Sequence, residues 1–321
     1  METTIGKRLN KEFFLKDSFC KENTEQYQLY ELKNETGSGE MCCYYVFDGI
    51  YMVYNDFHMK EISIDTQKYP AVIEINHCRE GRIECEYGGK YLYLEEGDFV
   101  IASKDTVSKR ESFPISHYHG ISVIIDFEGI TEETFQIMRM FSISMEKLKE
   151  RTCGGEKHFI MRRNDSIQHI FSELYIVHEN AKLNYFKIKV IELLLFITTI
   201  DFDKSREEKQ YFMRNQVEIV KRINEYITGN IDTHYTLEEL AKKYNISLTV
   251  MKNCFKGIYG TSIYSYVRNL RIQKSAILLK ETDLKIADIA GMVGYDNASK
   301  FSCAFKKIIG TTPLEYRKTT V

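Results

Sequence analysis

The chain has 321 residues, a length that favours two or three domains over one. Hydrophobic residues make up 43% of it and only three prolines occur, which predicts folded cores and excludes an intrinsically disordered protein. The net charge of −2 is unevenly spread: residues 214–321 hold 17 Lys and Arg against 10 Asp and Glu, a balance of +7, and the remainder carries −9. A basic C-terminal third on an acidic body is typical of a phosphate-binding module attached to a second module.

The cysteines and the N-terminal segment indicate the cellular compartment of the protein. The eight Cys residues form neither a CxxC pair nor a zinc-like spacing, which indicates reduced thiols in a cytoplasmic protein. The N-terminal segment METTIGKRLNKEFFLK lacks the apolar centre of a signal peptide. The longest apolar run, residues 190–200, contains Glu192 and is too short to cross a membrane. The sequence predicts a soluble cytoplasmic protein with no membrane partner.

The N-terminal part changes character near residue 36. Residues 1 to about 35 have scattered apolar positions with a helical appearance, and residues 36–39 break this pattern. Beyond the break, apolar residues in short runs bounded by turn residues predict strands at 41–47, 50–54, 71–75, 82–87, 90–94, 99–102 and 121–127. Gly88-Gly89 is expected to close a two-residue hairpin. Many short strands joined by glycine turns are typical of a small antiparallel barrel or jelly roll.

Candidate ligand-contacting residues lie within this strand region. His117 and His119 would face the same side of a strand, and His77 precedes Cys78 and Glu80. A metal site needs three or four converging ligands, and no such spacing is evident, so we expect neither a metal nor another cofactor. The mouth of a barrel suits a small-molecule effector. Its candidate lining residues, each equally well explained by ordinary core packing, are Tyr44, Tyr51, Arg82, Tyr91 and Tyr93.

Two amphipathic helices are predicted next. One begins at Asp165-Ser166 and places apolar residues near a 3.6-residue period as far as Val177. The other, about 185–200, is apolar enough to require a packing partner. Either both helices pack on the domain that precedes them, or they join two subunits; we favour a homodimer with this helical pair as its contact. The polar segment 201–214 is expected to be a linker.

The C-terminal part contains one helix–turn–helix pattern twice. In the later copy, residues 286–290 form a short helix, Gly294 permits the turn, and Asn297 caps a helix that Gly310 ends. In the earlier copy, Thr236 with Glu239 makes a capping box and Ser247 caps the second helix.

The two copies stay in register over a long stretch. From residue 255 onward the offset is fifty, so that Phe255 matches Phe305 and Gly260 matches Gly310; residues 236–241 match 285–290 at forty-nine. Chance similarity between amphipathic helices would not keep caps, glycines and aromatic residues aligned, so we infer an internal duplication. Two short helices joined by a tight turn form the unit that places a helix in the major groove of DNA.

These copies, TLEELAKKYNISLTVMKNCFKGIYGTSIYSYVRNLR and KIADIAGMVGYDNASKFSCAFKKIIGTTPLEYR, resemble the DNA-binding domain of the AraC/XylS family of bacterial transcription regulators. The resemblance covers about residues 215–317 and implies two helix-turn-helix units bridged by one long helix, here 263–280. At about 1.5 Å per residue this bridge is roughly 27 Å long, which suits two recognition helices in major-groove segments about 34 Å apart. The stretch YLEEGDFVIAS resembles the cupin-like sensor domain of many AraC-type regulators.

In the family, base-contacting side chains lie on the exposed face of the second helix of each unit. The first unit presents Lys and Asn, which can pair with guanine and adenine edges, and a Thr methyl group for thymine. The second unit presents smaller residues than its relatives do, so we expect it mainly to hold phosphate, with plain surface filling as the alternative. The predicted DNA-binding residues are Leu248, Thr249, Lys252, Asn253 and Lys256 in the first unit, and Ala298, Ser299, Lys300, Ser302, Cys303, Lys306 and Lys307 in the second.

The predicted fold class is a multidomain α+β chain. Residues 1–135 form a cupin-like, effector-sensing β-barrel, 136–200 a helical connector with the dimerisation helices, 201–214 a linker, and 215–321 an all-α double helix-turn-helix domain. The predicted function is that of a non-enzymatic, sequence-specific transcription regulator whose partners are double-stranded promoter DNA, a second copy of the chain and an unknown small-molecule effector. RNA polymerase is a further candidate partner.

Two other functions stay open. In one, the DNA-binding module is fused to an enzymatic barrel of a repair or dioxygenase-like kind, which a stoichiometric metal would support. In the other, the role is architectural, which a lack of sequence preference in DNA binding would support. The chain has no P-loop, dinucleotide motif or nucleophile–base set that would indicate an enzyme.

Overall fold

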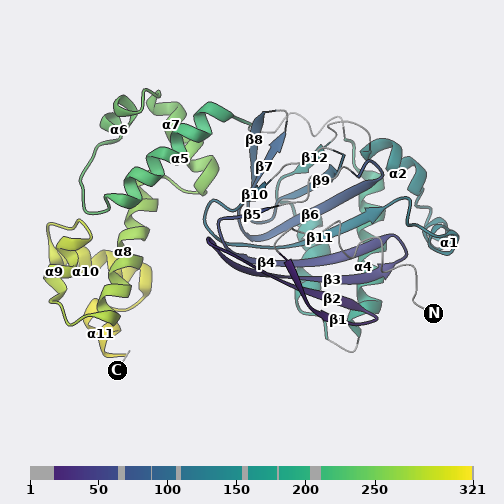
Figure 1. Cartoon of the computed structure of the whole chain (residues 1–321), viewed down its shortest axis with the longest axis horizontal. Helices are drawn as coiled ribbons and strands as arrows, with labels where there is room; N and C mark the ends of the chain where they lie inside the picture. Colours follow the sequence, from purple (N-terminus) through teal and green to yellow (C-terminus); the bar gives the residue numbers. More distant parts are fainter. Residues whose placement is uncertain are drawn as a thin grey trace. The chain divides into compact units, whose positions relative to one another are not determined.

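The computed structural model describes residues 18–63, 69–87, 89–105, 110–153, 158–178, 181–202 and 211–319. Two compact units divide the chain, Met1–Tyr211 and Phe212–Val321 (Figure 1). The first is rich in strands and the second is helical, so the predicted α+β class with a helical C-terminal domain is confirmed.

The strands of the first unit form two antiparallel sheets. The larger has the order β1-β2-β3-β4-β11-β6-β9-β12 and the smaller has, within this unit, the order β8-β7-β10-β5. The larger sheet consists of β1 (Ser18–Asn23), β2 (Tyr27–Asn34), β3 (Gly37–Phe47), β4 (Ile50–His58), β11 (Tyr118–Asp126), β6 (Val72–Gly81), β9 (Phe99–Ser103) and β12 (His158–Met161). The smaller consists of β8 (Lys90–Leu94), β7 (Ile83–Tyr87), β10 (Arg110–Ser112) and β5 (Glu61–Ser63). All seven predicted strands are present.

The larger sheet has an apolar core on each face. One core lies between this sheet and the helices, and the other between the two sheets. Strand β6 shows the alternation: Ile73 and Ile75 belong to the helical side, whereas Val72 belongs to the inter-sheet side, because successive side chains of a strand point to opposite faces. The helices are α1 (Glu132–Met140), α2 (Met145–Thr152), α3 (Asp165–Ser172), a 3₁₀ turn η1 (Glu173–Tyr175) and α4 (Lys182–Thr199).

The helical appearance expected for residues 1–35 is wrong for residues 18–34, which form β1 and β2. In β2, Gln28, Tyr30 and Leu32 are buried and the residues between them are not, which is the two-residue period of a strand. Strand β2 also pairs along its length with β3. Residues 1–17, and Gly88 of the predicted hairpin, lie outside the described part of the chain, but Tyr87 and Lys90 are paired as that hairpin requires.

The connector helices pack on their own domain. The side chain of Asn164 accepts a hydrogen bond from the amide of Ile167, 3.0 Å away, and so caps α3. Helix α4 buries Phe186, Leu193 and Leu194 in the core on the helical side of the sheet. The ring of Phe186 lies 5.0 Å from that of Tyr44 on β3. These residues are therefore unable to contact a second subunit.

The second unit consists of seven helices in the described residues 211–319, with a short strand β13 (Phe212–Met213) before them. They are α5 (Arg214–Gly229), α6 (Leu237–Lys243), α7 (Leu248–Tyr259), α8 (Ile263–Glu281), α9 (Ile286–Met292), α10 (Ala298–Ile309) and α11 (Pro313–Lys318). Helix α8 joins the pair α6–α7 to the pair α9–α10, as predicted for the bridge.

The duplication is repeated in the backbone of this unit. The turn between α6 and α7 contains Asn245 with φ +49°, and its counterpart forty-nine residues later, Gly294, has φ +80°. Both are left-handed, a conformation that Gly adopts freely and Asn tolerates best among the other residues. Helices α7 and α10 end on left-handed Gly260 and Gly310. Equivalent residues thus stop and turn the chain in both copies.

Candidate nucleic-acid interface

Helix α7 has one apolar face and one polar face. Met251, Cys254, Phe255 and Ile258 are buried, at the spacing of one side of a helix. The predicted DNA-binding residues Thr249, Lys252, Asn253 and Lys256 are exposed, and Leu248 is half-buried. Packing against the rest of the unit therefore uses one face of α7 and leaves the other free.

Helix α10 repeats this arrangement with different chemistry. Phe301 and Phe305 are fully buried in a core shared with α8 and α9. Of the predicted DNA-binding residues, Ser302 is half-buried and the remainder are exposed: Ala298, Ser299, Lys300, Cys303, Lys306 and Lys307. The exposed side chains near the helix start are small apart from Lys300, and the exposed face is basic towards its end, where Lys306 and Lys307 lie in the last turn.

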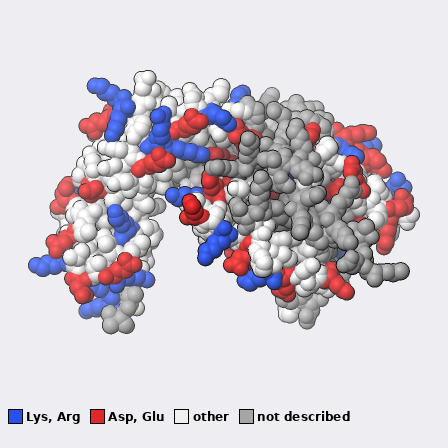
Figure 2. Space-filling model, viewed as in Figure 1, with Lys and Arg blue, Asp and Glu red and all other residues white. Residues whose placement is uncertain are grey.

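Capping side chains fix where both exposed faces begin. The Ser247 hydroxyl accepts a hydrogen bond from the amide of Val250 at 3.3 Å. The Asn297 side chain accepts from the amides of Ser299 and Lys300, at 2.8 and 3.0 Å. Such caps offset the unpaired amides of the first turn and stabilise a helix by about 1 kcal/mol. In the space-filling view, Lys and Arg side chains project from this unit with acidic side chains among them (Figure 2).

The predicted effector-contacting residues of the first unit do not form one set. Tyr44 belongs to the core on the helical side of the larger sheet, whereas Tyr51 belongs to the core between the sheets. A single cavity on one face of the sheet cannot be lined by both. The sequence did not predict which face of the larger sheet each tyrosine occupies, because Tyr44 and Tyr51 lie on different strands.

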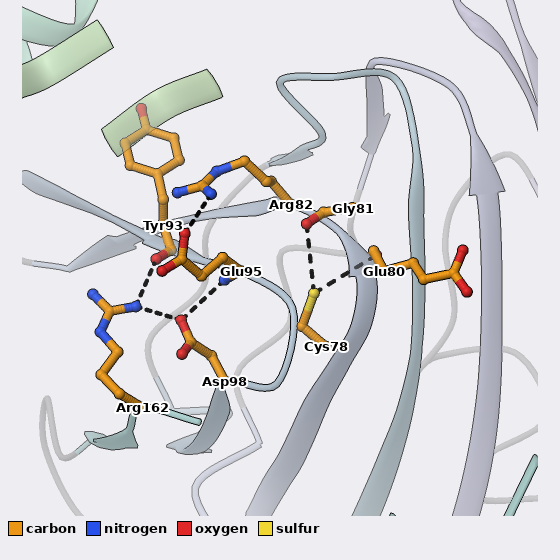
Figure 3. Close-up of polar contacts among 8 residues, drawn as sticks. All are labelled: Cys78, Glu80, Gly81, Arg82, Tyr93, Glu95, Asp98 and Arg162. Atoms are coloured by element: carbon orange, nitrogen blue, oxygen red, sulfur yellow. Dashed lines mark hydrogen bonds and ion pairs between the residues drawn. The ribbon is translucent and has the colours of Figure 1, made fainter. Parts of the chain in front are cut away.

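Arg82 and Tyr93 already have protein partners. Arg82 is buried, and its Nη1 donates to Glu95 Oε2 at 2.7 Å (Figure 3). The Tyr93 hydroxyl donates to Glu84 Oε2 at 2.6 Å, and both of these side chains are buried. Tyr91 is half-buried on the neighbouring position of β8. Arg82 and Tyr93 therefore bind other side chains of their own unit, and contact of these residues with an effector stays a prediction.

A different polar group lies between the two sheets and was missed by sequence reasoning. Glu74 of β6 forms an ion pair with Lys104, and the two side chains keep 18% and 30% of their surface accessible. Ser122 and Asn55 are buried beside them, with Asn55 Nδ2 donating to Ser122 Oγ at 3.1 Å. The alternation of side chains along β6 could have predicted that Glu74 lies on the other face of the sheet from Ile73 and Ile75. Lys104 comes after the end of β9, and no sequence pattern indicated where its side chain lies.

Glu111 approaches the same group from the smaller sheet. It is paired with Ile62, a residue of the inter-sheet core, so its side chain faces inward. Burial and the nearby Glu74 carboxylate raise the pKa of Glu111 to about 7, against the opposing effect of Lys104. For Glu74, burial is outweighed by the ion pair, so its pKa lies below the ordinary value. Two carboxyl groups thus share one ammonium group in the interior.

His77 lies apart from His117, whose ring is 5.0 Å from that of His58. His77 faces the helices, where its ring stacks on Phe171 at 4.3 Å, and burial lowers its pKa to about 4. His117 Nε2 lies 3.5 Å from Glu80 Oε2 near the surface. Within the described residues, no three His, Cys, Asp or Glu side chains are grouped so that they could hold a metal ion. Among those residues there is also no helix with the length and apolar character needed to cross a membrane.

Comparison with known proteins finds a helix-turn-helix family and transcription regulators that are similar to part of this chain. Residues 240–319 match the family described as helix-turn-helix domain. The transcriptional regulator Rob of Salmonella typhimurium is 32% identical over 106 residues, which are 33% of this chain and 37% of Rob. The HTH-type transcriptional activator RhaR of Mannheimia succiniciproducens is 23% identical over 151 residues, 47% of this chain and 54% of that protein.

The chain is also similar to a solved structure. The C-terminal domain of AraT, a response regulator from Geobacillus stearothermophilus, is 38% identical, with a TM-score of 0.31, over 32% of this chain and 84% of that domain. The chain spans well under two thirds of the length of the two curated relatives named above.

Proposed function

We propose that this protein, whose C-terminal unit belongs to the AraC-type helix-turn-helix family, is a sequence-specific transcription regulator that responds to a small molecule bound in its N-terminal unit. The observation that carries the proposal is the pair of equivalent helices, α7 and α10, each with a buried apolar face and a free polar face. A helix of this kind fits the major groove, which is wide enough to admit it.

The basic C-terminal unit supports the same function. Its 17 Lys and Arg against 10 Asp and Glu would attract the phosphate backbone, and each phosphate contact releases counterions. Selection of preferred duplexes from random DNA by the full-length protein tests the proposal. We expect a defined motif, bound with an affinity that falls steeply between low and moderate salt. Recovery of random sequence, or an affinity that does not change with salt, would contradict it.

We further propose that α4 joins two copies of the chain, through residues other than those buried in the subunit. Its solvent-facing side carries Ile188, 61% exposed, and Leu195, 37% exposed, with the half-buried Ile191 between them. Their spacing of three and four residues is that of the seam along which paired helices pack. An apolar stripe of this kind supports self-association, since its burial in a dimer would remove it from water. Sedimentation of the full-length chain measures the state directly.

The effector is proposed to bind between the two sheets. Glu74 and Lys104 are only partly buried in this space, and Glu111 faces them. Charged side chains in an apolar interior are costly unless they are paired or contact a ligand. Screening a metabolite library for compounds that raise the melting temperature tests the proposal, because binding to the folded state stabilises it. Stabilisation that persists unchanged in Glu111→Gln and Lys104→Met would place the ligand elsewhere.

A further inference from the structure

Arg271 of α8 contacts segments that belong to both halves of the C-terminal unit. Its Nε donates to the carbonyl of Ile231 at 2.8 Å and its Nη2 to the carbonyl of Thr233 at 3.1 Å, both in the connection between α5 and α6. Its Nη1 donates to the carbonyl of Gly294 at 2.8 Å, in the turn between α9 and α10. One guanidinium group therefore ties the α5–α6 connection, which leads into the first copy, to the turn of the second copy.

The chemistry of this contact requires arginine. A guanidinium group presents its donors in a rigid planar fork, so it can hold three carbonyl groups in fixed directions. Lysine carries the same charge but has a single flexible nitrogen. Hydrogen bonds from a charged donor are also stronger than those between neutral groups.

The backbone approaches closely at the same place. A Cβ atom on Gly294 would lie 2.7 Å from Arg271 Cζ and 2.9 Å from the carbonyl oxygen of Asp232. Gly294 is thus needed for its left-handed φ and also for the space in which the two segments meet. A second contact, His234 Nε2 to Asp296 Oδ2 at 3.4 Å, has both side chains largely exposed, so solvent screens it.

We propose that Arg271 fixes the separation and angle of α7 and α10, and thereby sets which spacing of two major-groove segments the protein accepts. Arg271 is a positioning residue here, since it contacts the backbone and no base. The proposal rests on the proposed function as a DNA-binding regulator.

The contacts of Arg271 with both segments are called the joint here, and the geometry of DNA explains why the joint affects binding. One added base pair moves the second groove segment by about 3.4 Å and rotates it by roughly 35°, from a turn of about 34–36 Å and 10–10.5 base pairs. Two recognition helices on a rigid joint cannot follow such a change. On a loosened joint, α8 still connects the copies but each can settle in its own groove segment.

The test varies the spacing within the selected site. Full-length wild type, Arg271→Gln and Arg271→Lys are titrated against the preferred duplex and against duplexes with one base pair added or removed between its two halves. We expect wild type to lose about tenfold in affinity per altered base pair, similar to one mismatch. Both variants should lose less than about threefold, with the base preference inside each half unchanged.

A matched control is available in the same unit. Arg317 Nη2 donates to the carbonyl of Leu284 at 2.7 Å, a bond that lies within the second copy. Arg317→Gln therefore removes an arginine–carbonyl bond without loosening the joint, and it should keep the wild-type dependence on spacing. If Arg271→Gln weakens binding to all spacings by the same factor, the residue is merely structural and the proposal is wrong.

Amide hydrogen exchange gives a second readout that does not need DNA. Arg271→Gln should speed exchange in residues 230–235 and 291–297 together, whereas Arg317→Gln should change neither. If the exchange rate of either segment does not change, Arg271 does not join the two segments and the proposal is wrong. If wild type selects no DNA motif while the two segments still respond together, the proposed function fails and the joint stands.

Discussion

Lys252→Ala and Asn253→Ala should each weaken binding to the preferred DNA site while leaving the protein folded. Both side chains are exposed on the free face of α7, opposite the buried Met251, Cys254 and Phe255. Their removal opens no cavity, so we expect the free energy of unfolding to change by less than about 0.5 kcal/mol.

The expected loss of binding follows from base recognition. A well-placed Lys–guanine or Asn–adenine pair discriminates by about 1–3 kcal/mol, which is roughly 5- to 150-fold in affinity at about 1.4 kcal/mol per tenfold. On α10 the corresponding side chains, Ser302 and Cys303, are short and one is half-buried. We therefore expect Ser302→Ala and Cys303→Ala to change the selected motif little.

Phosphate contacts should behave differently. Lys306, exposed in the last turn of α10, is expected to bind phosphate, so Lys306→Ala should weaken all sequences alike and lower the salt slope by about one. Between 50 and 200 mM salt, one fewer phosphate contact changes the ratio of affinities by about 3.5-fold, given a slope near 0.9 per phosphate.

The assay is selection of sites from random DNA with wild type and each variant, followed by titration at several salt concentrations. A larger change of the selected motif with Ser302→Ala and Cys303→Ala than with Lys252→Ala and Asn253→Ala would refute the division of roles between α7 and α10. Loss of affinity for every sequence with Lys252→Ala would show that Lys252 meets phosphate.

Three further outcomes are expected. Ile188→Glu should convert a dimer to a monomer in sedimentation while each monomer stays folded, because this side chain is exposed. Leu193→Ala, in the subunit core, should cost about 2–5 kcal/mol of stability. A wild-type monomer at working concentrations would count against the dimer. Phe305→Ala should destabilise the C-terminal unit by about 3–5 kcal/mol in urea unfolding, since the ring is fully buried, and a loss under 1 kcal/mol would contradict this packing. Burial raises the pKa of Glu111 to about 7, so between about pH 4 and 7 the folded state keeps a proton that the unfolded state releases. The contribution of Glu111 to folding stability is therefore full below about pH 4 and is lost as the pH rises through 7. The stability of Glu111→Gln relative to wild type should rise over that range, and a difference that does not change with pH would be inconsistent with the raised pKa.

The fold of the C-terminal unit could be predicted in detail because its signals are local. A capping box at Thr236 and Glu239, a cap at Asn297 and a left-handed Gly310 act within one turn of the backbone, and each is found where the sequence indicated. The strands beyond residue 36 could also be predicted from local signals, because turn residues lie at the ends of short apolar runs. Residues 18–34 were misread as helical because their apolar positions are scattered, and only pairing with β3 reveals the two-residue period.

By itself, the sequence determined the duplication, the bridge helix and most of the exposed side chains of α7 and α10, because caps, glycines and periodicity are encoded within a few residues. Only the tertiary structure decided which face of a strand or helix meets which neighbour. It put Tyr44 and Tyr51 in different cores, turned Leu193 and Ile188 to opposite sides of α4, and brought Arg271 to carbonyl groups 40 and 23 residues away. Such contacts join distant segments, and no local pattern encodes them, since they form only when the whole unit packs.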